Sequence, residues 1–150
     1  MDSMTLAKAG GEIIGNLVGA AIGSLIGALI IQLAARIVVK VKQDYGTAYA
    51  AAFLGYLVGF IIGFVLDLTL KLAGFAGMEM KFAATAVSVV LAFFAGAGVN
   101  AMLLRNAEGE RINYGQACLI SLIQVAIGLL IAGAILFLIF ILAAAFKAAS

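Results

Sequence analysis

Four long stretches without a charged side chain dominate the sequence, at positions 13–35, 45–66, 82–104 and 112–146. A helix needs about 20 consecutive, mostly apolar residues to cross the hydrocarbon core of a bilayer, and each stretch is long enough. Apolar and polar residues do not alternate with a period of two, which disfavours transmembrane β-strands. The sequence therefore predicts an all-α, polytopic membrane protein with four transmembrane helices.

The composition leads to the same fold class. Apolar residues make up 66% of the 150 positions and charged residues 11%, whereas soluble domains average about 45–50% and about 25%. We expect one transmembrane domain over 1–150, in a bacterial or archaeal cytoplasmic membrane or an organelle inner membrane. The first apolar stretch is expected to be a true helix, because no signal-peptide cleavage pattern follows it. The expected helices cover about 11–39, 45–72, 82–104 and 114–146.

Glycines recur every four residues in the first two expected helices. In lipid, such spacing gives a helix face on which another backbone can approach closely. We interpret these rows as a glycine zipper, used either inside one four-helix bundle or between subunits. The predicted packing glycines are Gly11, Gly15, Gly19, Gly23, Gly27, Gly55, Gly59, Gly63, Gly96 and Gly128.

The two halves of the chain resemble each other at an offset of 69 positions, which suggests repeats at 15–71 and 84–140. The matched polar pairs are Arg36 with Arg105, Lys42 with Arg111, Asp44 with Asn113, and Tyr45 with Tyr114. Each repeat holds two helices, so duplicated hairpins would be parallel, about an axis along the membrane normal. Asp44 and Asn113 suit helix N-caps, and Gly74 suits a C-terminal cap. The basic first connection favours placing the first and third connections in the cytoplasm.

Few polar side chains lie within the apolar stretches. Asp67, Gln32, Asn100 and Gln124 could line an intramembrane polar or ion path, and intramembrane ionisable groups are functional candidates. The alternatives are an interfacial Asp67–Lys71 ion pair, from their i, i+4 spacing, and amides that hydrogen-bond between helices. The ion pair and the interhelical hydrogen bonds are favoured over the polar path. Separately, a loop is expected over 73–80.

The sequence gives little support to an enzyme. It contains no histidine, the commonest general base and metal ligand, and its one cysteine, Cys118, is expected to be a small buried side chain. We predict no catalytic residue, no metal site and no cofactor. The net charge of +2 is spread thinly, so nucleic-acid binding is not expected.

The sequence resembles two families in part. Tandem hairpins, a glycine-rich first helix and the sequence Ala-Ala-Arg36 resemble the duplicated proteolipid c subunit of rotary ATPases. That resemblance implies a carboxylate near mid-membrane, but Asp67 lies towards the interface and Leu136 occupies the matching position. The glycine-rich opening also resembles mitochondrial translocase-type membrane subunits, over the first helix only. Neither resemblance assigns a family.

The expected function follows from these patterns. The first interpretation is a non-catalytic, accessory or structural subunit that packs through its glycine-rich faces in a larger membrane complex. Its partners would be the lipid bilayer and other membrane-protein subunits or copies of itself. The alternative is a small oligomeric channel or transporter for ions or small solutes.

Overall fold

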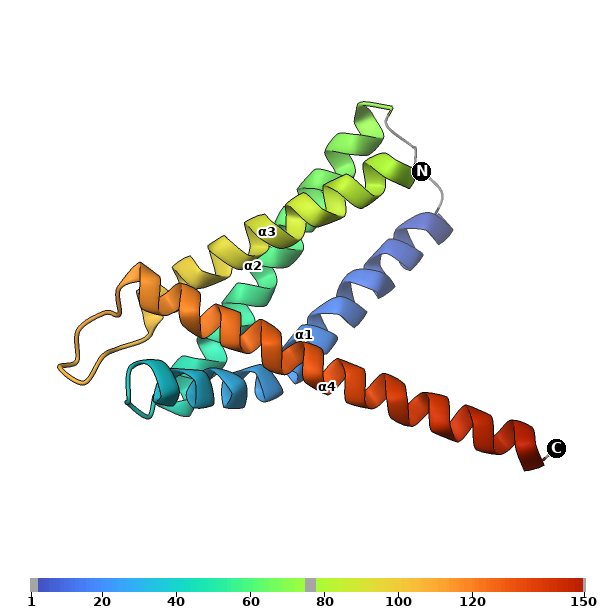
Figure 1. Ribbon diagram of the computed structural model, residues 1–150. Helices are drawn as coiled ribbons and strands as arrows, with labels where there is room; N and C mark the ends of the chain where they lie inside the picture. Colours follow the sequence, from blue (N-terminus) through green and yellow to red (C-terminus); the bar gives the residue numbers. More distant parts are fainter. Residues whose placement is uncertain (1–2, 75–77, 150) are drawn as a thin grey trace.

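The structure is a computed structural model that describes residues 3–74 and 78–149. It contains four helices, α1 (Ser3–Val38), α2 (Tyr45–Leu72), α3 (Met78–Leu103) and α4 (Tyr114–Ala149) (Figure 1). All four are long and apolar enough to cross a membrane. The prediction of an all-α protein with four membrane-spanning helices is therefore confirmed, and the fold is compatible with an integral membrane protein.

The helix bounds differ from the expected ranges mainly at the N-terminal ends. The helix α1 begins at Ser3, before the expected position 11, and α3 begins at Met78, before position 82. The expected loop over 73–80 lies partly outside the described residues, and its last part, Met78–Met80, belongs to α3. Here helix propensity continues beyond the uncharged stretch, because a helix end can carry charged residues that reach towards water.

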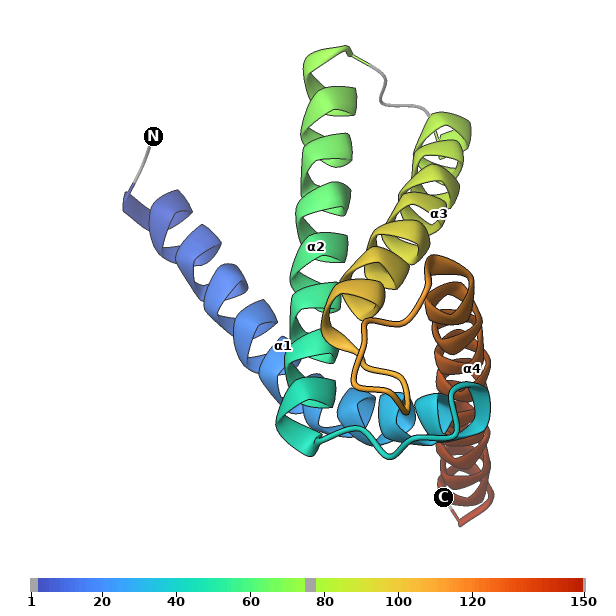
Figure 2. The same ribbon diagram turned by 90° about the vertical axis from the view of Figure 1, so that its left-hand side faces the viewer.

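The helices contact one another in the cyclic order α1–α2–α3–α4–α1. Among the described residues, the opposite pairs α1 with α3 and α2 with α4 make no contact. The helices α2 and α3 lie side by side over most of their length (Figures 1 and 2). The connections from α1 to α2 and from α3 to α4 lie at one end of the molecule, as expected for two hairpins placed in parallel (Figure 1).

The helix α1 changes direction near its middle, so that its two halves point differently (Figure 2). Gly23 and Ser24 occupy this central region, and the Ser24 hydroxyl donates a hydrogen bond to the carbonyl oxygen of Ala20 (2.6 Å). Serine bonds to the preceding turn, and adjacent glycine and serine residues, are recognised causes of bent helices. The C-terminal half of α1 thereby lies across the end of the bundle that holds the connections.

Side-chain caps fix the starts of α2 and α4, as the sequence predicts. Asp44 Oδ2 accepts a hydrogen bond from the backbone N–H of Thr47 (3.2 Å), and Asn113 Oδ1 accepts one from Gln116 (2.8 Å). In turn, Gln116 Oε1 accepts a hydrogen bond from the backbone N–H of Asn113 (3.2 Å), which completes a capping box. Gly74 follows α2 with a φ of +74°, the left-handed conformation that ends many helices.

The core is small, lies close to the connections and consists mainly of alanine. Its members come from α1, α2, α4 and the α3–α4 connection: Ala28, Ile31, Ala34, Ala35, Ala48, Ala51, Leu104, Ile112, Ala117 and Ile120. Small side chains let the helices approach closely where they cross. In a membrane protein this packing contributes stability through contacts, because lipid tails are as apolar as the core.

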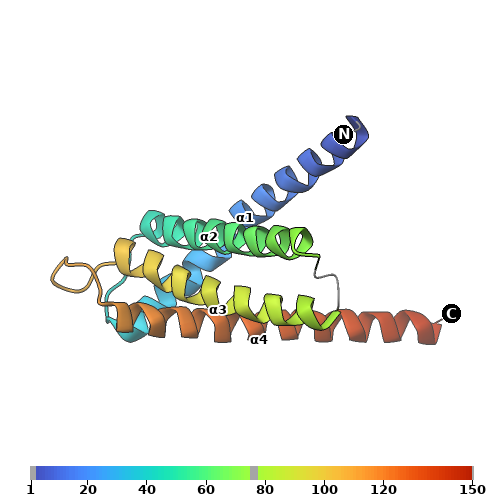
Figure 3. The same cartoon turned by 90° about the horizontal axis from the view of Figure 1, so that it is seen from above.

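Away from this core the molecule is open. The C-terminal half of α4 extends beyond the other helices, and the N-terminal half of α1 points in a different direction (Figure 3). The accessible surface is 10313 Å², whereas a compact chain of 15.4 kDa is expected to expose about 7,200 Å². The described chain therefore leaves roughly 3,000 Å² more surface uncovered than a compact monomer would.

Candidate functional site

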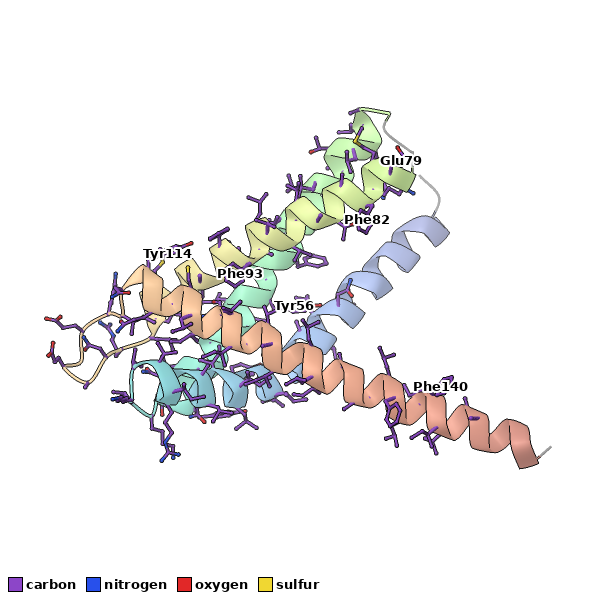
Figure 4. The ribbon with its side chains drawn as sticks, viewed as in Figure 1. Tyr56, Glu79, Phe82, Phe93, Tyr114 and Phe140 are labelled. Atoms are coloured by element: carbon purple, nitrogen blue, oxygen red, sulfur yellow. The ribbon has the colours of Figure 1, made fainter. Side chains whose placement is uncertain are left out.

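A cavity of about 300 Å³ lies between the four helices, on the side of the core away from the connections. All four helices contribute to its lining. Figure 4 shows two of its aromatic residues, Tyr56 and Phe93, on the middle turns of α2 and α3. Because Gly23, Gly27, Gly55 and Gly96 also line it, the cavity exists where these glycines leave the helix surfaces without side chains.

A cluster of neutral polar side chains forms one wall of the cavity. Asn100 of α3 is 3% exposed, and its Nδ2 donates to Ser121 Oγ (3.0 Å) and Gln124 Oε1 (3.3 Å) on α4. Ser121 and Gln124 lie three residues apart, on one face of α4. These bonds join the last turn of α3 to α4, and the cluster offers hydrogen bonds to the cavity without a charged group.

Two of the four predicted path residues, Asn100 and Gln124, therefore meet in this cavity. The other two lie elsewhere. Gln32 Nε2 donates to the backbone carbonyl oxygen of Gln43 (2.9 Å), so it holds the α1–α2 connection. Asp67 lies near the other end of α2, beside a separate cavity of about 180 Å³ shared with α3.

Asp67 forms the expected ion pair with Lys71, with Oδ2 and Nζ 2.6 Å apart. Both side chains are more than half exposed, so the pair is not buried within the chain. Within residues 3–74 and 78–149, no three histidine, cysteine, aspartate or glutamate side chains gather closely enough to hold a metal ion.

Three polar cavity residues, Ser24, Tyr56 and Ser121, were not predicted from the sequence. Ser121 could have been found, because it precedes Gln124 by one helical turn and shares its face. Ser24 and Tyr56 gave no such signal. Cys118 was expected to be buried but is half-buried, because the buried face of α4 passes through its neighbours Ala117, Ile120 and Ser121 instead.

The predicted packing glycines differ in what they face. Only two approach another helix: a Cβ at Gly27 would lie 3.1 Å from Ala52 Cβ, and one at Gly59 would lie 3.6 Å from Ala92 Cβ. In the described part of the chain, a Cβ would find open space at the other eight: Gly11, Gly15, Gly19, Gly23, Gly55, Gly63, Gly96 and Gly128. Most of the glycine row on α1 is thus unoccupied within one chain.

Matching hydrogen bonds occur at the starts of α2 and α4. The Tyr45 hydroxyl donates to the carbonyl oxygen of Leu25 (3.2 Å), and the Tyr114 hydroxyl donates to that of Phe94 (2.9 Å). In both cases the acceptor is 20 residues before the tyrosine. Donor and acceptor of the second bond both lie 69 positions after those of the first.

Comparison with models of known protein families, with curated proteins and with solved structures gives no match for this chain.

Proposed function

We propose that this protein is a non-catalytic subunit of a membrane assembly, built from two duplicated helical hairpins, that packs through glycine-rich helix faces. The observation that carries the proposal is the open glycine row of α1. In lipid, a glycine face gains stability only when another helix packs against it, and within this chain most of the row faces open space. Helix association in membranes depends on such close packing.

The free half of α4 supports the same proposal. Its side chains are exposed from Leu129 to Ala144, and Phe140, at 71% exposure, stands clear of every other helix (Figure 4). At about 1.5 Å per residue, its 36 residues span about 54 Å, well beyond a hydrocarbon core of about 30 Å. A helix this long needs tilt or a partner beside its surplus length.

The duplication is supported by the matched polar contacts. The N-caps at Asp44 and Asn113 and the tyrosine bonds to Leu25 and Phe94 all repeat at the same offset. Two parallel hairpins of this kind would offer two similar lateral surfaces to neighbouring helices. We place the protein in a bacterial or archaeal cytoplasmic membrane or an organelle inner membrane, with the α1–α2 and α3–α4 connections facing the cytoplasm or its equivalent.

The test is the composition of the native particle. We expect the tagged protein, extracted in mild detergent, to migrate on a native gel as a complex of fixed stoichiometry. The double substitution of Gly15→Leu and Gly19→Leu should dissociate that complex, because the new side chains would fill the space along the glycine row. Gly98→Leu is the matched control on α3, outside the predicted row. Migration of the unmodified protein as a lone monomer would contradict the proposal.

The polar cavity favours a second candidate function, a small channel or transporter. Its neutral wall of Asn100, Ser121 and Gln124 suits a small solute that exchanges hydrogen bonds, or water accompanying an ion. The protein reconstituted in vesicles would then increase solute or ion flux, and Asn100→Leu would abolish the increase. Asp67→Asn should leave flux unchanged, since Asp67 lies outside this cavity. Vesicles that show no flux across a panel of solutes and ions would exclude this function.

A further inference from the structure

The packing between α2 and α3 shows how small residues are used in this protein. On α3, Ala84, Ser88, Ala92 and Gly96 recur every four residues and are all half-buried. Gly59 of α2 faces the middle of this row, where its Cβ would lie 3.6 Å from Ala92 Cβ. Ala84 and Ser88 lie opposite the next turns of α2, beside Gly63. One helix therefore presents a row of small residues, and the other places Gly59 against the middle of that row.

At the offset of 69 positions, the small-residue face of α3 corresponds to a face of α1, and the glycine face of α2 corresponds to a face of α4. The row on α3 corresponds to the glycine row on α1, as follows: Ala84 to Gly15, Ser88 to Gly19, Ala92 to Gly23 and Gly96 to Gly27. On α2, Gly59 corresponds to Gly128 of α4, and Gly63 to Ala132. Thus α1 has the face with which α3 packs, and α4 has the face with which α2 packs.

The contact between α1 and α4 is formed only in part. Near the connections, Ile31 and Ala35 of α1 share the core with Ala117 and Ile120 of α4. Farther along, α1 and α4 diverge (Figure 3), and a Cβ at Gly23 or Gly128 would meet no atom within 4 Å in the described part of the chain. The unoccupied faces are therefore continuous with an interface that already exists.

We propose that α4 of a second copy of this chain occupies the glycine row of α1, with Gly128 of one copy against Gly23 of the other. The chain's own α4 lines the same cavity as Gly23 through Gln124 and Val125 and diverges from the row beyond them (Figure 3). Exchange between two copies forms two identical contacts about a two-fold axis and leaves neither face open. The excess surface of roughly 3,000 Å² per chain is enough for a permanent homodimer, which buries about 2,000–5,000 Å² in total.

This inference rests on the proposed function, because it names the partner of the same glycine face. Disulfide cross-linking tests it in membranes, with Cys118→Ala removing the chain's one native cysteine. One copy carries Gly23→Cys and one tag, and the other carries Gly128→Cys and a second tag. After oxidation we expect a covalent dimer that contains both tags, since disulfides join Cβ atoms about 3.5–4.5 Å apart.

Two controls make the cross-link interpretable. Gly59→Cys with Ala92→Cys in one chain should form an intrachain disulfide, because the corresponding Cβ separation is 3.6 Å. Leu130→Cys in place of Gly128→Cys should form no dimer with Gly23→Cys, because Leu130 is 74% exposed and lies about 200° around the helix from Gly128.

The outcomes separate this inference from the proposed function. Absence of the two-tag dimer, or an intrachain bond when Gly23→Cys and Gly128→Cys are placed in one chain, would overturn the exchange. If either result is obtained while the protein still migrates in a native complex with other polypeptides, the exchange is wrong but the proposed function is retained. Failure of the Gly59–Ala92 control would also overturn the inference, because it would remove the packing from which the register is taken.

A steric substitution gives a second, independent readout. Gly19→Leu should weaken the dimer about tenfold or more, measured by energy transfer between differently labelled copies in vesicles, because overpacking a close contact costs enough for such a change. Gly98→Leu is the matched control, since the corresponding residue of the first half is Leu29, which is 58% exposed. Equal dimer affinity for the two variants would contradict the proposal.

Discussion

The side-chain amide of Gln43 makes two hydrogen bonds with the backbone of Arg105. Its Nε2 donates to the Arg105 carbonyl oxygen, and its Oε1 accepts from the Arg105 N–H (3.2 Å). The two residues are 62 positions apart and belong to different hairpins. Gln43 is 5% exposed, and its backbone carbonyl oxygen accepts a hydrogen bond from Gln32 Nε2. One side chain thus joins the two connections at the same end of the molecule.

Substitution of Gln43 should loosen the contact between the hairpins. We expect Gln43→Leu to lower the free energy of unfolding by about 2 kcal/mol, because it leaves backbone groups of Arg105 without partners. Thermal unfolding in detergent, followed by helical circular dichroism, measures the loss. Lys42→Ala, at an exposed neighbouring position, should change stability by less than about 0.5 kcal/mol. Equal stability of the two variants would contradict the role given to Gln43.

The two matched tyrosines should contribute similarly to stability. Tyr45→Phe and Tyr114→Phe each remove one hydroxyl bond to a helix carbonyl, so each should cost about 0.5–1.5 kcal/mol. Tyr49→Phe should cost less, because its bond to the Ala21 carbonyl oxygen is longer, at 3.4 Å. The same unfolding measurement ranks the three variants, and a loss at only one of the matched positions would argue against equivalent hairpins.

The amide cluster should stabilise the pairing of α3 with α4. Asn100→Ala removes the donor to both Ser121 and Gln124, and interhelical hydrogen bonds in membranes average about 0.6 kcal/mol each. We therefore expect a loss of about 1 kcal/mol in resistance to denaturation by SDS. Asn100→Asp should cost more, because a carboxylate has no N–H to donate to Ser121 and Gln124, and a charge is expensive to place at a position that is 3% exposed. A carboxylate tolerated at this position without loss would show that the cluster is open to water.

Lys40 offers a stabilising substitution. It follows α1 in the left-handed conformation, with a φ of 56°, which costs a residue with a side chain about 1–2 kcal/mol. Lys40→Gly removes this strain, while the added freedom of glycine in the unfolded chain offsets about 0.5–1 kcal/mol. The net gain in the free energy of unfolding should be about 0–1.5 kcal/mol. Lys40→Val, which favours extended conformations, should be destabilising.

Local rules of sequence predicted the four helices and the caps at the starts of α2 and α4. Long uncharged stretches identify the membrane-spanning segments, because lipid imposes a length and excludes charges. The caps at Asp44 and Asn113 and the Asp67–Lys71 pair depend on neighbours within four residues, so their spacing was enough to find them. The same holds for Gly74, where one backbone conformation ends a helix.

Relations between distant segments were not predictable in this way. The glycine spacing of α1 predicts a helix face without side chains, but it does not predict which helix packs against that face. In the structure, most of the row faces open space. The position of Gln32 in an apolar stretch allows either a polar path or a hydrogen bond, and spacing alone does not identify its partner, the carbonyl oxygen of Gln43 in the α1–α2 connection. The cavity needs residues from four helices, so only the Asn100–Gln124 part of it was anticipated.

An alanine-based core gives this protein an unusual tolerance profile. Alanine can lose only one methyl group, so truncation at Ala28, Ala34, Ala48 or Ala117 removes little contact area. Enlargement has the opposite effect, because a longer side chain at any of these fully buried positions must push two helix backbones apart. We therefore expect these sites to accept only glycine, serine or alanine, whereas the exposed apolar residues of the same helices should exchange freely among apolar types.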